Sequence, residues 1–291
     1  MRDSSIPITK EKSDPKAEVL SIVQKSGTSF YWAMRLLPSQ KRDAMFAIYA
    51  FCREVDDIAD GEESSKIKLE KLQYWREQIN DLYKGRPKNL IMQALIGPLK
   101  NYDLAKEDFV AVIDGMETDA IGQVRIKNMD ALVQYCDRVA CAVGRLSNAV
   151  FGLAPEQRNS LAKALGEALQ LTNILRDIHE DAKRNHIYLP KDLLAQNGID
   201  NREIKDILES PRLQEVCSKL AERTRQDFKQ AKSIIKNCDK TRIRPAIIMM
   251  EIYHRLFLLL ERRGWDSLNL PVKVSKVWKL LLAARILIFN K

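Results

Sequence analysis

Two apolar stretches of this chain each carry a pair of aspartates four residues apart, and this repetition limits the folds that can accommodate it. The pairs are Asp56 with Asp60 and Asp177 with Asp181. Residues four apart lie on one face of an α-helix, so each pair sets two carboxylates side by side. Such charges are costly in an apolar helix unless a cation compensates them or water reaches them. The spacing therefore predicts two helices that each present an acidic, ion-binding face.

The second pair belongs to a longer polar stripe. Asn173 precedes Asp177 by four residues, and Gln170 precedes Asn173 by three, so all lie on one helix face. Mg²⁺ fits this stripe because it accepts carboxylate oxygens while keeping waters and substrate phosphate oxygens. An EF-hand calcium loop does not fit, because its glycine and its final glutamate are missing. The alternative is that each cluster is only a solvated acidic face.

Arginines accompany both acidic clusters. Arg53 lies three residues before Asp56. Arg176 directly precedes Asp177. Because guanidinium groups bind phosphate oxygens in a bidentate manner, the pattern predicts a diphosphate held between metal ions and arginines. Each arginine could instead form a salt bridge with the neighbouring aspartate.

The rest of the sequence favours a single all-α domain. Only 11 glycines and 10 prolines occur in 291 residues, and no strong period-2 pattern predicts a strand. We predict a disordered lead over residues 1–14 and one helical domain over residues 15–291. Helical spacing begins near residue 17, and further helices are predicted over residues 39–60, 64–84, 89–100, 105–120, 128–151, 155–184, 202–209, 211–237, 241–263 and 272–289.

The net charge of +9 indicates an anionic partner, which could be a nucleic acid, an anionic membrane surface or a phosphorylated substrate. Acidic residues are interleaved with the basic ones throughout, so nucleic-acid binding is not expected. The five cysteines form no CxxC pair, which predicts free thiols in a reducing cytoplasm. Neither a secretory signal nor an apolar run of membrane-spanning length is expected.

The C-terminal segment Val277–Phe289 is apolar but contains Lys279 and Arg285. It could form a last core helix or an interfacial helix. We therefore expect a cytoplasmic protein that makes transient contact with the inner face of the membrane.

Four segments together resemble the squalene/phytoene synthase family, nearly from end to end. The resemblance rests on Ser29–Ala33 with Leu36–Pro38, on Ala47–Asp60, on Tyr135–Ala140 with Val143–Gly144, and on Gly166–Asp181 with Ile187–Pro190.

The resemblance implies an isoprenoid synthase bundle around a central cavity, with the two aspartate pairs facing each other. It implies that Mg²⁺ is bound by Asp56, Asp60, Asn173, Asp177 and Asp181, and that Arg53 and Tyr49 act with the four aspartates in catalysis. It further implies substrate contacts from Ser26, Ser29, Tyr49, Arg53, Gln170, Asn173, Arg176 and Tyr253. The reaction passes through an allylic cation, for which aromatic rings including Phe30 and Tyr135 are candidate neighbours.

Within the family, the segments Arg244–Ala246 and Glu261–Trp265 resemble bacterial presqualene diphosphate synthases of the hopanoid pathway. The implied reaction is head-to-head condensation of two farnesyl diphosphates to presqualene diphosphate, with release of diphosphate and hand-off to downstream hopanoid-pathway enzymes. NADPH is not expected. The alternatives are a phytoene synthase acting on two geranylgeranyl diphosphates, and a complete squalene or dehydrosqualene synthase.

Two positions depart from the family pattern. His186 stands where a basic residue, commonly arginine, precedes Ile-Tyr-Leu-Pro, which weakens a diphosphate contact at neutral pH. Ile126 replaces a tyrosine that often follows the arginine near position 125.

A terpene cyclase is disfavoured, because Arg176 stands at the serine or threonine position of its second metal motif. A non-catalytic scaffolding relative is disfavoured too, because both aspartate pairs are present.

Overall fold

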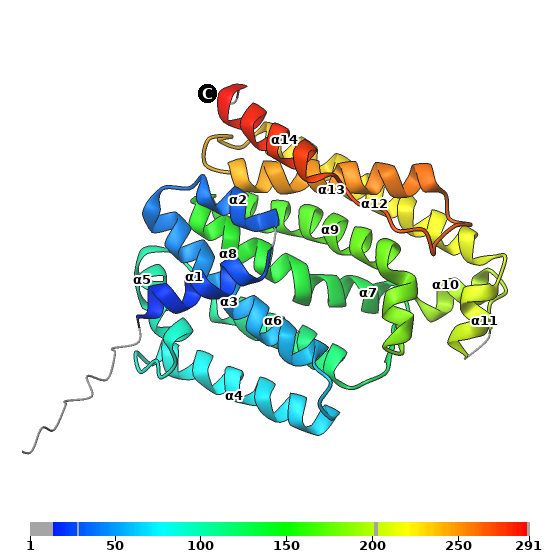
Figure 1. Cartoon of the computed structure of the whole chain (residues 1–291), viewed down its shortest axis with the longest axis horizontal. Coiled ribbons are helices and arrows are strands. Elements are labelled where there is room, and N and C mark those ends of the chain that lie inside the picture. Colours follow the sequence, from blue (N-terminus) through cyan, green and yellow to red (C-terminus); the bar gives the residue numbers. More distant parts are fainter. Residues whose placement is uncertain (1–13, 28, 201–202, 290–291) are drawn as a thin grey trace, which may run out of the picture.

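The computed structural model describes residues 14–27, 29–200 and 203–289, without the side chains of residues 29, 32 and 287–289. Helices dominate the described residues and pack into one bundle (Figure 1). The α-helices are α1 (Pro15–Lys25), α2 (Ser29–Arg35), α3 (Ser39–Asp60), α4 (Ser65–Tyr83), α5 (Leu90–Asn101), α6 (Lys106–Ala120), α7 (Met129–Cys136), α8 (Ala142–Phe151), α9 (Pro155–Lys183), α10 (Lys191–Gln196), α11 (Ile204–Glu209), α12 (Leu213–Lys236), α13 (Arg244–Arg263) and α14 (Lys276–Phe289).

The predicted all-α class is confirmed, and the helix boundaries agree with the sequence pattern to within a few residues at most ends. The predicted lead falls outside the described residues up to residue 13. Asp14 is described, and its carboxylate accepts a hydrogen bond from the Lys16 backbone amide at 3.0 Å, which caps α1. All five cysteines are free thiols, as expected, and four of them are buried.

Two local features differ from the sequence-based expectation. The helix predicted over residues 128–151 is interrupted by a π-helical turn, η1 (Asp137–Cys141), between α7 and α8. Two two-residue strands, β1 (Val124–Arg125) and β2 (His186–Ile187), pair in parallel. The strand pair ties the chain after α6 to the end of α9, where Asn185 adopts a positive φ of 65°. Strands this short have no periodicity that a sequence could reveal.

Helix α9, 29 residues long, is the central element and packs against α8, α12, α13 and η1 (Figure 1). Pro155 occupies its first turn, where a missing amide proton costs nothing. Its close approach to η1 depends on Gly166, because a Cβ there would lie 2.8 Å from the Cys141 sulfur. Across η1, Gly115 of α6 similarly leaves room for Val139. Small residues therefore let α6, η1 and α9 meet closely.

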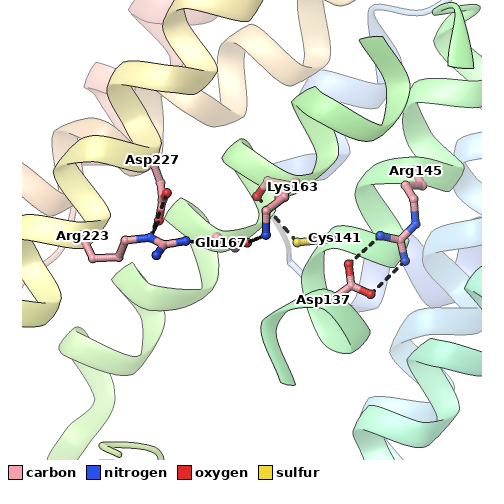
Figure 2. Close-up of polar contacts among 7 residues, drawn as sticks. All are labelled: Asp137, Cys141, Arg145, Lys163, Glu167, Arg223 and Asp227. Carbon is pink, nitrogen blue, oxygen red and sulfur yellow. Dashed lines mark hydrogen bonds and ion pairs between the residues drawn. The ribbon is translucent and has the colours of Figure 1, made fainter. Parts of the chain in front are cut away.

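A network of charged side chains joins α9 to α12 (Figure 2). Glu167 of α9, with 3% of its side chain exposed, accepts a hydrogen bond from Arg223 of α12 at 2.6 Å. It also pairs with Lys163 one turn earlier. Arg223 reaches Asp227 on its own helix at 3.2 Å. Hence the buried carboxylate at the centre of this network has two cationic partners.

Helix α14 lies on the outside of the bundle, against α13 (Figure 1). Leu282 and Ile286 are buried, whereas Val277, Leu280 and Leu281 are more than half exposed. Across the described residues, no helix combines the length and the apolar character needed to span a membrane.

Candidate active site

A cavity of about 1220 Å³ opens among α3, α6, α7, α9 and α13, and the segment of residues 268–279 forms part of its wall. Helices α3 and α9 carry the two predicted aspartate pairs, and all four carboxylates line this cavity. The two pairs are 121 residues apart in sequence, so their common location is a consequence of the tertiary fold. Both pairs therefore face one space, as the family resemblance implied.

Three of the four aspartates, Asp56, Asp60 and Asp177, pair with arginines. Arg53 pairs with Asp56 at 3.2 Å and with Asp57, outside the cavity wall, at 2.5 Å. Arg184 pairs with Asp60. This last contact links α3 to the end of α9 across the cavity mouth.

On α9, Arg176 pairs with Asp177 at 2.5 Å. The salt bridges considered at the sequence level are thus formed, and they place arginine side chains within reach of an anion at the mouth. Each of these guanidinium groups is at least partly exposed, so it can turn toward a phosphate without a large desolvation cost.

Burial and like charge disfavour ionisation of one carboxyl in each pair. Burial, reinforced by Asp60, raises the pKa of Asp56 to about 6. Burial, reinforced by Asp177, raises the pKa of Asp181 to about 7. A bound cation would relieve both costs, because it attracts the carboxylates and replaces their lost water.

The donor atoms present fit a divalent cation. The side-chain oxygen of Asn173 is buried and has no hydrogen-bond partner, while the amide nitrogen lies 3.5 Å from the Gln170 oxygen. A buried acceptor without a donor is rare in proteins, and a metal ion is one partner that can satisfy such an oxygen. Among the residues that the structure describes, however, no three His, Cys, Asp or Glu side chains are close enough together to hold a metal ion unaided. The arrangement therefore fits ions that share carboxylates, an amide oxygen and substrate phosphate oxygens.

The remaining predicted residues divide into two groups. Phe30, Tyr135, Gln170 and Tyr253 line the cavity together with Arg53 and Arg176. Tyr253 is half-buried beside Arg176, and desolvation raises the pKa of its hydroxyl group.

Two predicted substrate-contacting residues lie off the cavity wall. The Ser26 hydroxyl donates to the Val23 carbonyl at 2.8 Å at the end of α1. Tyr49 is half-buried behind Phe30, with ring centroids 6.4 Å apart. Ser29 begins α2, but its side chain is outside the described part of the structure.

The sequence analysis missed Asp119 of α6, which is buried on the cavity wall. Its carboxylate accepts hydrogen bonds from the hydroxyls of Tyr135 at 2.9 Å and Tyr188 at 2.7 Å. A signal was present, because Asp119 follows Val112 and Met116 on the buried stripe of α6. A lone carboxylate on an apolar stripe indicates either a buried partner or a site.

The sequence analysis also missed the segment after α13, which brings Lys273, Lys276 and Lys279 to the cavity wall. His186 lines the same cavity and is buried, and burial lowers its pKa. The imidazole is therefore neutral at pH 7, and the positive charges at the mouth come from lysines and arginines.

Several known proteins are similar to this chain. The chain matches the family model for squalene/phytoene synthase over residues 23–278. It is 43% identical over 254 residues to presqualene diphosphate synthase of Sinorhizobium fredii, covering 87% of this chain and 90% of that protein. It is 32% identical over 266 residues to chloroplastic phytoene synthase 1 of Zea mays, covering 89% of this chain and 65% of that protein. Its structure is similar to a crystal structure of a dehydrosqualene synthase in complex with ligand, with a TM-score of 0.80, 26% identity and coverage of 94% and 95%.

Proposed function

Because this chain belongs to the squalene/phytoene synthase family, we propose that it condenses two farnesyl diphosphates head to head into presqualene diphosphate. One diphosphate is released, and the other remains on the product. Support comes from the higher identity to a presqualene diphosphate synthase, at 43%, than to a phytoene synthase, at 32%. Enzymes of this family are prenyltransferases that use a divalent metal with diphosphate substrates.

The observation that carries the proposal is the meeting of two acidic helix faces with arginines at the mouth of one large cavity. In this proposal Asp56, Asp60, Asp177, Asp181 and the Asn173 oxygen hold Mg²⁺. When bound, Mg²⁺ neutralises charge that develops on the departing diphosphate.

The chain's own cationic side chains share this task. Arg53, Arg176 and Arg184 exchange their aspartate partners for phosphate oxygens and orient the diphosphate at the mouth. The Gln170 amide lines the same cavity and can donate to the same oxygens. These contacts strengthen as the carbon–oxygen bond breaks, because negative charge then accumulates on the leaving group.

The apolar part of the cavity then controls the carbocation. Phe30, Met116 and Ile174 exclude water from the wall, which prevents early capture of the cation. The double bond of the second substrate attacks the cation, and transfer of a proton to the released diphosphate then closes a cyclopropane ring. Contact with the second substrate remains the proposed role of Ser26, Ser29 and Tyr49. They could also shape the cavity wall behind Phe30.

The test is incubation of the full chain with Mg²⁺ and farnesyl or geranylgeranyl diphosphate, with and without NADPH. Presqualene diphosphate from farnesyl diphosphate, unchanged by NADPH, is the expected result. A C40 product formed preferentially from geranylgeranyl diphosphate would identify a phytoene synthase instead. NADPH-dependent conversion to squalene would identify the complete synthase, and no turnover of any prenyl diphosphate would refute the proposal.

We also propose that the protein docks transiently on the anionic cytoplasmic face of a membrane, from which its lipid product passes to downstream enzymes. Val277, Leu280 and Leu281 form an exposed apolar face on α14, with exposed Lys276 and Arg285 on the same helix. This helix continues directly from the cavity wall, and basic residues beside apolar ones favour anionic lipid surfaces.

Sedimentation with lipid vesicles tests this docking. The protein should bind vesicles containing anionic lipid more strongly than zwitterionic ones, and Leu280→Asp with Leu281→Asp should remove the binding. Ile121→Asp is the matched control, because Ile121 is 54% exposed but belongs to the end of α6. Equal sedimentation of the double variant and the unmodified protein would contradict the proposed docking face.

A further inference from the structure

Asp119 is a buried carboxyl on the cavity wall that the diphosphate chemistry proposed above does not use. Its side chain retains 8% exposure. Within the described part of the chain, no arginine or lysine pairs with it, and its hydrogen bonds come from two tyrosine hydroxyls. In this respect Asp119 differs from Asp56 and Asp177, which have arginine partners.

The two tyrosines are fixed in orientation by this carboxylate. Tyr135 of α7 donates to one carboxylate oxygen at 2.9 Å, and Tyr188, just after β2, donates to the other at 2.7 Å. Their rings stack with centroids 4.9 Å apart and an interplanar angle of 29°. All three side chains line the cavity.

The hydrogen-bond directions determine the sign of the field at this wall. A tyrosine hydroxyl has a single proton, so donation to Asp119 uses that proton and leaves only oxygen lone pairs for other neighbours. Aromatic ring faces also carry negative potential. Met116 and Val139, which line the same cavity, are apolar and do not screen this field. The wall is therefore electronegative without offering a hydroxyl proton.

We propose that Asp119 is the counter-charge that stabilises the carbocation of the condensation, through its own charge and by fixing the hydroxyls of Tyr135 and Tyr188. This inference rests on the proposed function for the identity of the cation. Asp119 is a positioning residue, because it acts on the reacting carbons through the tyrosines and across the cavity.

The protonation behaviour of Asp119 agrees with this role. Burial raises the pKa of Asp119 to about 7, although both tyrosine hydrogen bonds lower it. The carboxylate is therefore poorly solvated, and a cation entering the cavity would supply the missing stabilisation. The same attraction stabilises the carbocation, because the carboxylate and the cation both lie in a medium of low dielectric constant.

A binding experiment tests the charge without requiring turnover. The probe is a trialkylammonium compound with farnesyl-length chains, compared with its neutral carbon isostere, each titrated calorimetrically with Mg²⁺ and inorganic diphosphate present. The unmodified protein should bind the ammonium at least about tenfold more tightly than the isostere, and Asp119→Asn should remove that preference. Asp119→Asn preserves side-chain shape, so the apolar contacts with both probes remain comparable.

Asp108→Asn is the matched control. Asp108 is also a buried carboxyl of α6, but it pairs with Arg145 at 2.6 Å and does not line the cavity. This variant should lose thermal stability while keeping the preference for the ammonium probe. If Asp119→Asn keeps that preference as well, Asp119 is only a structural hydrogen-bond acceptor and the proposal is wrong.

Product analysis provides a second measurement. With farnesyl diphosphate, Asp119→Asn should lower kcat by about 10²–10³, as removal of one preorganised electrostatic partner does, while KM changes little. A larger share of the product should be alcohols formed when water captures the cation, and Asp119→Glu should partly restore the normal ratio of presqualene diphosphate to alcohol.

Full rescue of Asp119→Asn by excess Mg²⁺ would instead show that Asp119 supports the metal site, which overturns the proposal. A third outcome separates the two proposals. If the unmodified protein makes no presqualene diphosphate but Asp119→Asn still removes the preference for the ammonium probe, the role of Asp119 as counter-charge stands and only the proposed function is refuted.

Discussion

Two segments of α9 treat their carboxylates in opposite ways. On the side toward α12, Glu167 is 3% exposed and is enclosed by Lys163 and Arg223 (Figure 2). On the cavity side, Asp181 is partly buried among other acids, and no salt bridge to it is formed among the described residues. One helix therefore carries a neutralised charge cluster and an excess of negative charge about four turns apart.

This difference separates a structural use of charge from a functional one. A carboxylate that is already paired with cations gains little from a new ligand, and its loss affects mainly stability. A carboxylate held near other acids is destabilised by repulsion until a cation binds. Relief of this repulsion then adds to the free energy of cation binding. Stability and activity should consequently respond to different substitutions on the same helix.

The largest effect is expected from removal of divalent metal. Chelation with EDTA should abolish turnover of farnesyl diphosphate, because the four aspartates then repel the diphosphate instead of binding it. Helical content, measured by circular dichroism, should remain unchanged, since the bundle core does not depend on the site. Activity should return when Mg²⁺ is added in excess. Undiminished turnover in EDTA would refute the metal assignment.

Loss of one acid on the cavity side should have the next largest effect. Asp177→Ala should lower kcat by about 10²–10³ or more, the scale of a lost preorganised electrostatic contact. Its melting temperature should change by only a few degrees, because removal of Asp177 also relieves repulsion with Asp181. The measurement is steady-state kinetics beside thermal unfolding. Near-normal rates would show that this aspartate does not hold an essential ion.

In the segment that packs against α12, Glu167→Gln should reverse this pattern. We expect a loss of about 1–3 kcal/mol in the free energy of unfolding, as for a lost hydrogen bond to a charged group. The loss should fall below the roughly 3–5 kcal/mol of a fully enclosed pair, because Arg223 and Lys163 can turn to water. Urea unfolding measures the change, and kcat per folded molecule should be retained. A loss of activity with unchanged stability would contradict the separation of the two segments.

The smallest effect is expected at the exposed end of the same network. Lys163 is 60% exposed, so its pair with Glu167 is screened by water, and Arg223 still neutralises the carboxylate. Lys163→Ala should therefore change the unfolding free energy by no more than about 1 kcal/mol. A loss as large as that of Glu167→Gln would show that the lysine, rather than the arginine, neutralises this carboxylate.

Prediction from the sequence succeeded where the information is local. The spacing of Asp177 and Asp181 placed both on one helix face, and the structure places both on the cavity wall. Ser26 and Tyr49, which match family positions, lie off that wall, and their substrate contacts stay predictions. It failed for Asp119, because a single acid in an otherwise ordinary helix has no spacing partner to mark it.

The amino-acid sequence by itself determined the helical class, the acidic faces and the family. These follow from periodicity over a few residues and from motifs whose members are close in the chain. Only the tertiary structure decided which faces meet. It brought α3 to α9, enclosed Asp119 between tyrosines from two elements, and folded residues 268–279 over the cavity. The physical reason is that a helix fixes the direction of its own side chains, whereas a cavity depends on how distant helices pack.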